Sequence, residues 1–259
     1  MDIEQVPGVL ACDVGNTSIR LAVVTADAPS AVQTVRVGEL AGLGPILAAL
    51  WREMPPPRKL AACSVNPAAL KALEAAAAEA IDEPVLVVGR DLPAPIDTNL
   101  PNPSATGTDR LCAAAAAFDR LGVACVVADF GTAVTIDCID DQGIFLGGAI
   151  LPGLGLSAHS LHEGTAQLPL VDLANPKSAF GKDTRQAILA GLVVGARGAL
   201  RELVETYATE LGHWPVVILT GGDAALVAGE VNTSDLVQAI VPDLVLRGVA
   251  AAYFRSLLK

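Results

Sequence analysis

Residues 9–24 read VLACDVGNTSIRLAVV, and residues 125–139 read CVVADFGTAVTIDCI. In each stretch an apolar strand runs into Asp-x-Gly and a small polar residue, and then into a second β-rich strand. Asp13 and Asp129 are the only acidic residues in the two leading strands, and a carboxylate is costly to bury without a cation or a donor. The glycine allows a tight turn that brings backbone amides close to a ligand. The pattern therefore predicts a paired site for a metal ion and nucleotide phosphates.

Each stretch taken alone is also explained as an ordinary hairpin turn, because Asp, Asn and Gly favour such turns wherever they occur. Two copies at corresponding places in two halves of the chain are harder to explain in this way. The repeat therefore favours a binding site, and it indicates a duplication with the join near residue 120.

Length and composition indicate a folded protein of two domains. The chain has 259 residues, of which 52% are apolar and 3% aromatic. The formal net charge is −11, and no cluster of Lys and Arg interrupts the acidic balance. Neither nucleic acid nor a membrane surface is therefore an expected partner.

The cysteines and the start of the chain favour a reducing compartment. Five scattered cysteines form no CxxC pair, which argues for free thiols. The first residues, MDIEQVPG, lack the basic and apolar regions of a signal peptide, and no apolar run reaches the roughly 18 residues of a membrane span. We expect a cytoplasmic protein.

Strand and helix patterns alternate along the chain, which predicts an α/β fold with domains at 1–120 and 121–259. The expected strands are 8–14, 19–25, 60–65, 85–89, 124–130, 144–150, 215–220 and 235–240. The expected helices are 38–52, 67–80, 108–121, 155–165, 183–210 and 243–258.

Two further motifs lie where a predicted helix begins. Gly107-Thr108-Asp109-Arg110 opens the helix at 108–121, and Thr220-Gly221-Gly222 follows a strand. The glycine pair would let a base or ribose approach the backbone. Structural roles explain both motifs about equally well, because Asp in a first helical turn complements the helix dipole and a short strand–helix connection needs glycine.

Several common catalytic motifs are absent from the sequence. There is no GxxxxGK[ST], which excludes a Walker-type kinase, and no GxSxG for an acyl-transfer serine. His159 and His162 stand beside Glu163, but a polar helix face explains this spacing better than a zinc site does. The Asp-x-Gly turns remain the main indication of chemistry.

Taken in order, the motifs resemble those of type III pantothenate kinases, members of the actin/hexokinase/Hsp70-like ATPase superfamily. The resemblance covers nearly the whole chain, and it is specific because seven motifs occur in order. They are Asp13-x-Gly15-Asn16-Thr17, Asn102-Pro103 with Gly107-x-Asp109-Arg110, Asp129-x-Gly131-Thr132-Ala133-x-Thr135-x-Asp137, Gly147-Gly148-x-Ile150-x-Pro152-Gly153, Thr165-Ala166-x-Leu168-Pro169, Gly181-Lys182-x-Thr184 and Thr220-Gly221-Gly222.

The resemblance implies two similar ribonuclease-H-like, actin-like ATPase domains, with mixed sheets flanked by helices. It also implies ATP-dependent phosphorylation of pantothenate, the first step of coenzyme A synthesis, by a homodimer that needs Mg²⁺ and a monovalent cation such as K⁺ or NH₄⁺.

The resemblance also assigns roles to residues. Asp109 would accept the proton of the substrate hydroxyl, and Asp129 would bind the monovalent cation. Thr184 would reach pantothenate across the dimer interface. The residues expected at ATP are Asp13, Val14, Gly15, Asn16, Thr17, Ser18, Ile19, Arg20 and Thr132, joined by Gly221 and Gly222; those expected at pantothenate are Leu100, Gly107, Thr108, Asp109, Arg110 and Thr184.

Two further roles are hypotheses that combine the chemistry of the residues with the ligands that the resemblance implies. Asp13 is placed to hold Mg²⁺, directly or through water, because Mg²⁺ keeps several waters and uses few carboxylates. Arg110 is the motif residue best suited to pair with the carboxylate of pantothenate, since a guanidinium binds carboxylates with two parallel hydrogen bonds. An ion pair between Arg110 and Asp109 is the alternative.

Two positions depart from the resemblance. Leu100 stands where relatives usually carry tyrosine, and Thr108 is more polar than the expected alanine. Leu100 leaves open a kinase or phosphatase of the same superfamily that acts on another small substrate. A non-catalytic regulatory paralogue is a second alternative, although Asp13, Asp109 and Asp129 favour catalysis.

Overall fold

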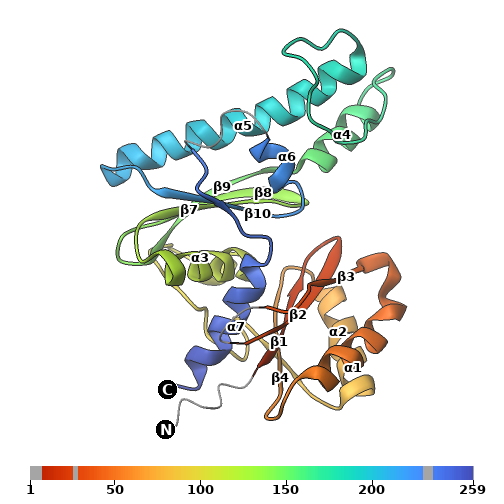
Figure 1. Cartoon of the computed structure of the whole chain (residues 1–259), viewed down its shortest axis with the longest axis vertical. Coiled ribbons are helices and arrows are strands. Elements are labelled where there is room, and N and C mark those ends of the chain that lie inside the picture. The colour runs from red at the N-terminus through yellow and green to blue at the C-terminus, as the bar shows by residue number, and fades with distance from the viewer. Residues whose placement is uncertain (1–7, 26–28, 230–235, 259) are drawn as a thin grey trace. The chain divides into compact units, whose positions relative to one another are not determined.

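The computed structural model describes residues 8–25, 29–229 and 236–258. Its contacts divide the chain into two compact units (Figure 1). The first unit comprises residues 1–120 and 243–259, and the second comprises residues 121–242.

The first unit is built on a five-stranded mixed sheet. Its order is β3-β2-β1-β4-β5, in which β1, β2 and β3 are antiparallel and β4 and β5 continue parallel to β1. The strands are β1 (Val9–Val14), β2 (Ser18–Val24), β3 (Gln33–Arg36), β4 (Lys59–Ser64) and β5 (Val85–Val87), and the helices are α1 (Leu43–Glu53), α2 (Pro67–Ile81), α3 (Thr108–Leu121) and α7 (Leu244–Ser256). The loop before α3 contains β6 (Asp97–Thr98) and a short 3₁₀ turn, η3 (Pro103–Ala105).

The second unit repeats this topology. Its strands follow the order β9-β8-β7-β10-β11, with β7, β8 and β9 antiparallel and β10 and β11 parallel to β7. They are β7 (Cys125–Phe130), β8 (Ala133–Ile139), β9 (Ile144–Pro152), β10 (Val216–Thr220) and β11 (Ala239–Ile240), accompanied by α4 (Leu154–Glu163), α5 (Thr184–Leu211) and α6 (Ala224–Ala228). The predicted α/β fold of two similar halves is confirmed.

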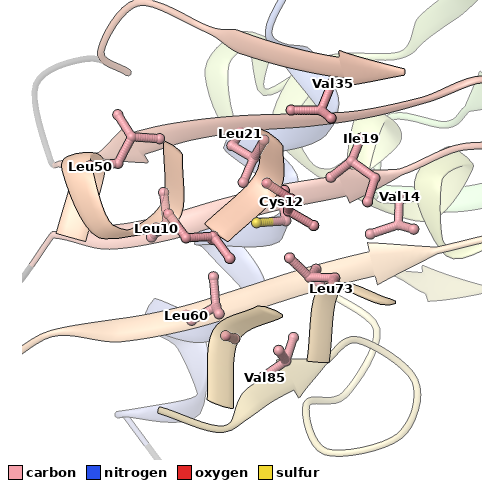
Figure 2. Packing of buried hydrophobic residues seen from close by; sticks show 14 of the residues in the cluster. Leu10, Cys12, Val14, Ile19, Leu21, Val35, Leu50, Leu60, Leu73 and Val85 are labelled. Carbon is pink, nitrogen blue, oxygen red and sulfur yellow. The ribbon is translucent and has the colours of Figure 1, made fainter. Parts of the chain in front are cut away.

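Alternation along the strands separates a core face from a polar-bearing face. Leu10, Cys12 and Val14 of β1 pack with Leu21 and Leu73 between the first sheet and its helices, as Figure 2 shows. Successive side chains of a strand point to opposite faces, so Asp13 points away from this core. In the second unit, the even-numbered β7 residues from Val126 to Phe130 share a core with α5, and Asp129 again points the other way.

The last helix, α7, belongs to the first unit and not to the second, where the expected domain boundary places it. Helix α7 contacts β1, β2 and β4, and it lies on the side of these strands opposite to α1 and α2 (Figure 1). Residues 243–259 therefore belong to the first unit, whereas the expected boundary put them in a domain of residues 121–259. Local sequence shows that a helix has an apolar face, but not which sheet that face will cover.

Most expected elements lie within a few residues of the observed ones. The helix expected at 38–52 is split into a 3₁₀ helix, η2 (Val37–Gly42), and α1. Pro45 falls in the first turn of α1, where its missing N–H costs nothing, and this fixes the start of the α-helix. Residue 235, the first of the strand expected at 235–240, lies outside the described residues. No helix among the described residues is long and apolar enough to cross a membrane.

Candidate active site

The first Asp-x-Gly turn places Asp13 in the middle of a row of three side chains. Asp13 is paired with Arg20 on β2 and with Cys63 on β4, so all three share one face of the sheet. The Cys63 thiol donates a hydrogen bond to Asp13 Oδ1 over 3.7 Å. Gly15 closes the turn by donating its N–H to Ser18 O at 3.0 Å.

The surroundings of Asp13 make the ionised form of its carboxyl less favourable than in water. Burial raises the pKa of this carboxyl to about 6, and the negative charge of Asp109 acts in the same direction, against Arg20 and the Cys63 thiol. The pKa of Cys63 is itself raised well above its ordinary value, first by a hydrogen bond with Cys112 and then by burial, so the thiol stays protonated and can donate. A cation beside Asp13 and Asp109 would relieve both carboxylates, so this donor set fits Mg²⁺.

We expect Asp13→Asn to stabilise the metal-free protein at neutral pH. The folded-state pKa of about 6 exceeds the ordinary 3.8, so the folded protein holds this proton more tightly than the unfolded chain does. The free energy of unfolding therefore falls as pH rises from about 4 to 6, and the loss persists above that range. Removing the charge should recover about 3 kcal/mol at pH 8 and little at pH 4, as measured by urea unfolding.

Addition of Mg²⁺ provides the control for this experiment. It should stabilise the wild type much more than Asp13→Asn, because the variant lacks the Asp13 carboxylate. A variant that loses stability equally at both pH values would contradict the assignment.

The start of α3 holds Asp109 in a defined position. Asp109 Oδ1 accepts a hydrogen bond from the Arg110 N–H at 2.8 Å. A Cβ added to Gly107 would lie 2.5 Å from the same oxygen, so a larger residue there would displace the carboxylate from this position. Burial raises the pKa of Asp109, while the N–H and the guanidinium of Arg110 lower it. This carboxyl is suited to take up a proton from a bound hydroxyl.

Thr108 has a structural role that the sequence did not predict. Its hydroxyl accepts from Ser64 N at 3.2 Å and lies 3.3 Å from Ser64 O, to which it donates. These bonds fasten the start of α3 to the end of β4, one residue beyond Cys63. The tether explains a polar residue at this position, and the hydroxyl already has partners without a substrate.

The other expected ATP and pantothenate residues of the first unit differ in what they can offer. Asn16 and Thr17 are exposed at the tip of the turn, whereas the side chains of Val14 and Ile19 are buried in the core. Those two can therefore contribute only backbone groups. Leu100 is half-buried in the loop before α3 and donates its N–H to Thr98 Oγ1 at 3.1 Å.

The second turn repeats the arrangement around Asp129. Asp129 is paired with Thr135 on β8 and Thr220 on β10, and Gly131 donates its N–H to Ala133 O at 3.2 Å. Gly221 has a φ of +91°, and a Cβ there would lie 2.4 Å from Asp129 Oδ1. Glycine is therefore required where this loop passes over the carboxylate.

The remaining expected residues lie at exposed positions of the second unit. Thr132 and Gly222 are exposed, and α6 after Gly222 has only five residues, so its dipole is weak. Thr184 is the exposed first residue of α5, whose N-cap is Asp183: its carboxylate accepts from the Gln186 N–H at 2.8 Å. An Asp at the start of an expected helix is typical of an N-cap, and the structure confirms this for Asp183. His159 and His162 contact backbone carbonyls of Gly155 and Leu168, as a polar helix face requires.

The structure thus brings together Asp13, Arg20 and Asp109 in one unit, and Asp129 and Gly221 in the other. A sequence profile described as type III pantothenate kinase matches residues 9–206.

The chain belongs to the type III pantothenate kinase family.

Full-length relatives agree with this assignment. A type III pantothenate kinase of Chlorobaculum parvum is 32% identical over 249 residues, which cover 93% of this chain and 92% of the relative. The family membership therefore extends over both units and not only over the motifs.

Two crystal structures share the fold. One, from Campylobacter jejuni, is of a protein proposed to be a Baf family transcriptional activator; its TM-score is 0.62 at 19% identity, and the match covers 96% of this chain and 100% of that one. The other is component A of (R)-2-hydroxyglutaryl-CoA dehydratase from Acidaminococcus fermentans, with a TM-score of 0.56 at 16% identity and coverage of 97% and 99%. At these identities the likeness establishes the actin-like ATPase fold alone.

Proposed function

We propose that this chain transfers the terminal phosphoryl group of ATP to the primary hydroxyl of pantothenate, which gives 4′-phosphopantothenate in the first step of coenzyme A biosynthesis. The main support for this proposal is that the chain belongs to this kinase family and holds Asp109 at the start of α3, close enough to Asp13 for the two charges to interact. Phosphoryl transfer depends mainly on positioning and charge stabilisation, and these are what the two carboxylates and the Asp-x-Gly turns can supply.

The candidate site residues of the first unit each have a defined task in the proposed reaction. Asp109 accepts the proton as the substrate hydroxyl attacks the terminal phosphorus, and the Arg110 N–H keeps its carboxylate in place. The turn at Gly15 offers backbone groups and the Asn16 and Thr17 side chains to the phosphates of ATP. Arg110 pairs with the carboxylate of pantothenate, which orients the hydroxyl toward Asp109.

Two cations complete the proposal. Mg²⁺, when bound, neutralises the charge that develops on the phosphates; Asp13 would hold it. Asp129 would hold a monovalent cation, K⁺ or NH₄⁺, and Thr132, Gly221 and Gly222 would contact ATP from the second unit. The close approach of the Gly221 backbone to Asp129 supports this placement.

We further propose a homodimer formed through the second unit. Large apolar side chains are exposed there at Leu156, Phe180 and Val194, and Gly191 and Gly195 of α5 have open space around them. Exposed apolar side chains of this size supply area for a contact, and small residues on a helix allow close packing against a second copy. Thr184, at the start of the same helix, would then reach the partner's substrate. Sedimentation equilibrium at micromolar concentration should give twice the mass of the chain, and a monomer would overturn this part.

We infer the compartment of the protein from its free thiols, and the partners that it does not bind from its net charge. The five cysteines are free and buried, which suits a reducing cytoplasm. With a net charge of −11, the chain has no evident means of binding nucleic acid or anionic lipid, and we propose neither as a partner.

A coupled assay of ADP formation tests the function. Turnover should require pantothenate, Mg²⁺ and K⁺ together, and mass spectrometry should find 4′-phosphopantothenate. A screen of other small alcohols under the same conditions tests the consequence of Leu100. Faster turnover of another alcohol would overturn the substrate assignment, and ATP hydrolysis indifferent to every alcohol would overturn the kinase assignment.

A further inference from the structure

The side-chain hydroxyl of Thr220 is buried without a hydrogen bond to any described residue. The residue is 1% exposed, and its Oγ1 has no hydrogen-bond partner among the described residues. Buried hydroxyl groups in folded proteins are nearly always hydrogen-bonded, because an unpartnered one loses its hydration without replacement. A partner that binds from outside the chain would explain its retention.

The position of Thr220 on the sheet indicates where that partner lies. Thr220 on β10 and Thr135 on β8 flank Asp129 on β7, each in direct register with it. The three side chains share the face that points away from the α5 core, so they form a row of oxygen-bearing groups. Gly131 and Gly221 both lie close to Asp129 Oδ1, which leaves only a small space beside this row.

The equivalent row of the first unit shows a different arrangement. There Cys63 occupies the position of Thr220, and its thiol donates directly to the Asp13 carboxylate. In the second unit the hydroxyl of Thr220 makes no such bond within the described residues, although it stands in the same register with Asp129. A hydroxyl that makes no bond to the neighbouring carboxylate keeps its oxygen lone pairs available for a ligand.

We propose that Thr220 Oγ1 and the Asp129 carboxylate together bind the monovalent cation, an inference that rests on the cation requirement in the proposed function. The carboxylate would repel a phosphate group, whereas a small hard cation accepts carboxylate and hydroxyl oxygens at once. Cation binding gives the buried hydroxyl of Thr220 the partner that it lacks among the described residues.

Thermal unfolding with and without K⁺ tests the proposal independently of turnover. KCl should raise the Tm of the wild type relative to N-methylglucamine chloride at equal ionic strength. Thr220→Val keeps the shape but removes the ligand, so it should need roughly tenfold more K⁺ for the same rise. Without K⁺ this variant should be as stable as the wild type or more so, because an unpartnered hydroxyl is gone.

Two further variants separate ligation from packing. Thr220→Ser keeps the oxygen and should retain most of the K⁺ response. Thr209→Val makes the same chemical change on α5, where the hydroxyl donates to Glu205 O, and should leave the response unchanged. An equal K⁺ response in Thr220→Val and the wild type would overturn the proposal, as would loss of the response in Thr220→Ser.

Thallium, a K⁺ substitute with strong anomalous scattering, locates the cation directly. A Tl⁺ peak in contact with both Thr220 Oγ1 and Asp129 supports the proposal, and a water at Thr220 with Tl⁺ elsewhere overturns it. Pantothenate turnover with unchanged K⁺ activation in Thr220→Val would refute this site and leave the kinase assignment intact. Tl⁺ at Thr220 in a protein that does not phosphorylate pantothenate would refute the kinase assignment instead.

Discussion

Asp109→Asn is expected to lower kcat for pantothenate phosphorylation by about 10²–10⁴-fold, the range typical for loss of a general base. Asparagine keeps the size of the side chain and an oxygen that can accept the Arg110 N–H, so α3 should start as in the wild type. It cannot take up a proton. ATP affinity, measured by calorimetry, should therefore be nearly unchanged while single-turnover phosphoryl transfer slows.

A matched control lies on the same helix. Asp119 is exposed near the end of α3 and pairs with Arg255, so Asp119→Asn makes the same chemical change without touching the proposed base. Its kcat should equal that of the wild type. Equal kcat values for wild type and Asp109→Asn would remove Asp109 from the reaction.

The pH profile gives a second check on Asp109. Burial raises the pKa of this carboxyl, and a base must be deprotonated to act. The value of kcat/KM should therefore fall on the acidic side, with a midpoint above the ordinary aspartate range. A profile that stays flat down to pH 4 would contradict both the raised pKa and the role.

The fold was largely predictable because its strands are marked by local sequence. Runs such as Val9–Val14 and Cys125–Phe130 are apolar, are interrupted once by Asp, and end at glycine turns. The N-cap at Asp183 was predictable for the same reason, since its effect acts within one turn of the helix. The repeat of the Asp-x-Gly pattern was enough to predict two similar halves.

The details that were missed depend on contacts distant in sequence. Cys63 is a partner of Asp13 only because β4 pairs with β1, and Thr108 reaches Ser64 across 44 residues. The orphan hydroxyl of Thr220 could be found only once burial was known. The missing information is how elements that are distant in sequence pack together, because this decides which side chains become neighbours.

Gly248→Ala is expected to reduce the free energy of unfolding by about 3 kcal/mol, the upper end of the usual cost of overpacking. A Cβ at this position of α7 would lie 1.9 Å from the backbone oxygen of Cys112 in α3, and backbone cannot move aside as a flexible side chain can. The two helices would have to separate, and α3 carries Asp109 at its start. Urea unfolding measures the loss, and the folded fraction should also show a lower kcat.

Gly44→Ala is the control for this effect within the same unit. A Cβ there would meet Ala80 Cβ at 3.8 Å, an ordinary contact, in the first turn of α1. Since alanine favours helix more than glycine does, this variant should gain about 0.5–1 kcal/mol. If both variants were equally stable, α3 and α7 could not be in backbone contact at Gly248. The bond between Thr108 and Ser64 would still hold the start of α3, which carries Asp109, against β4.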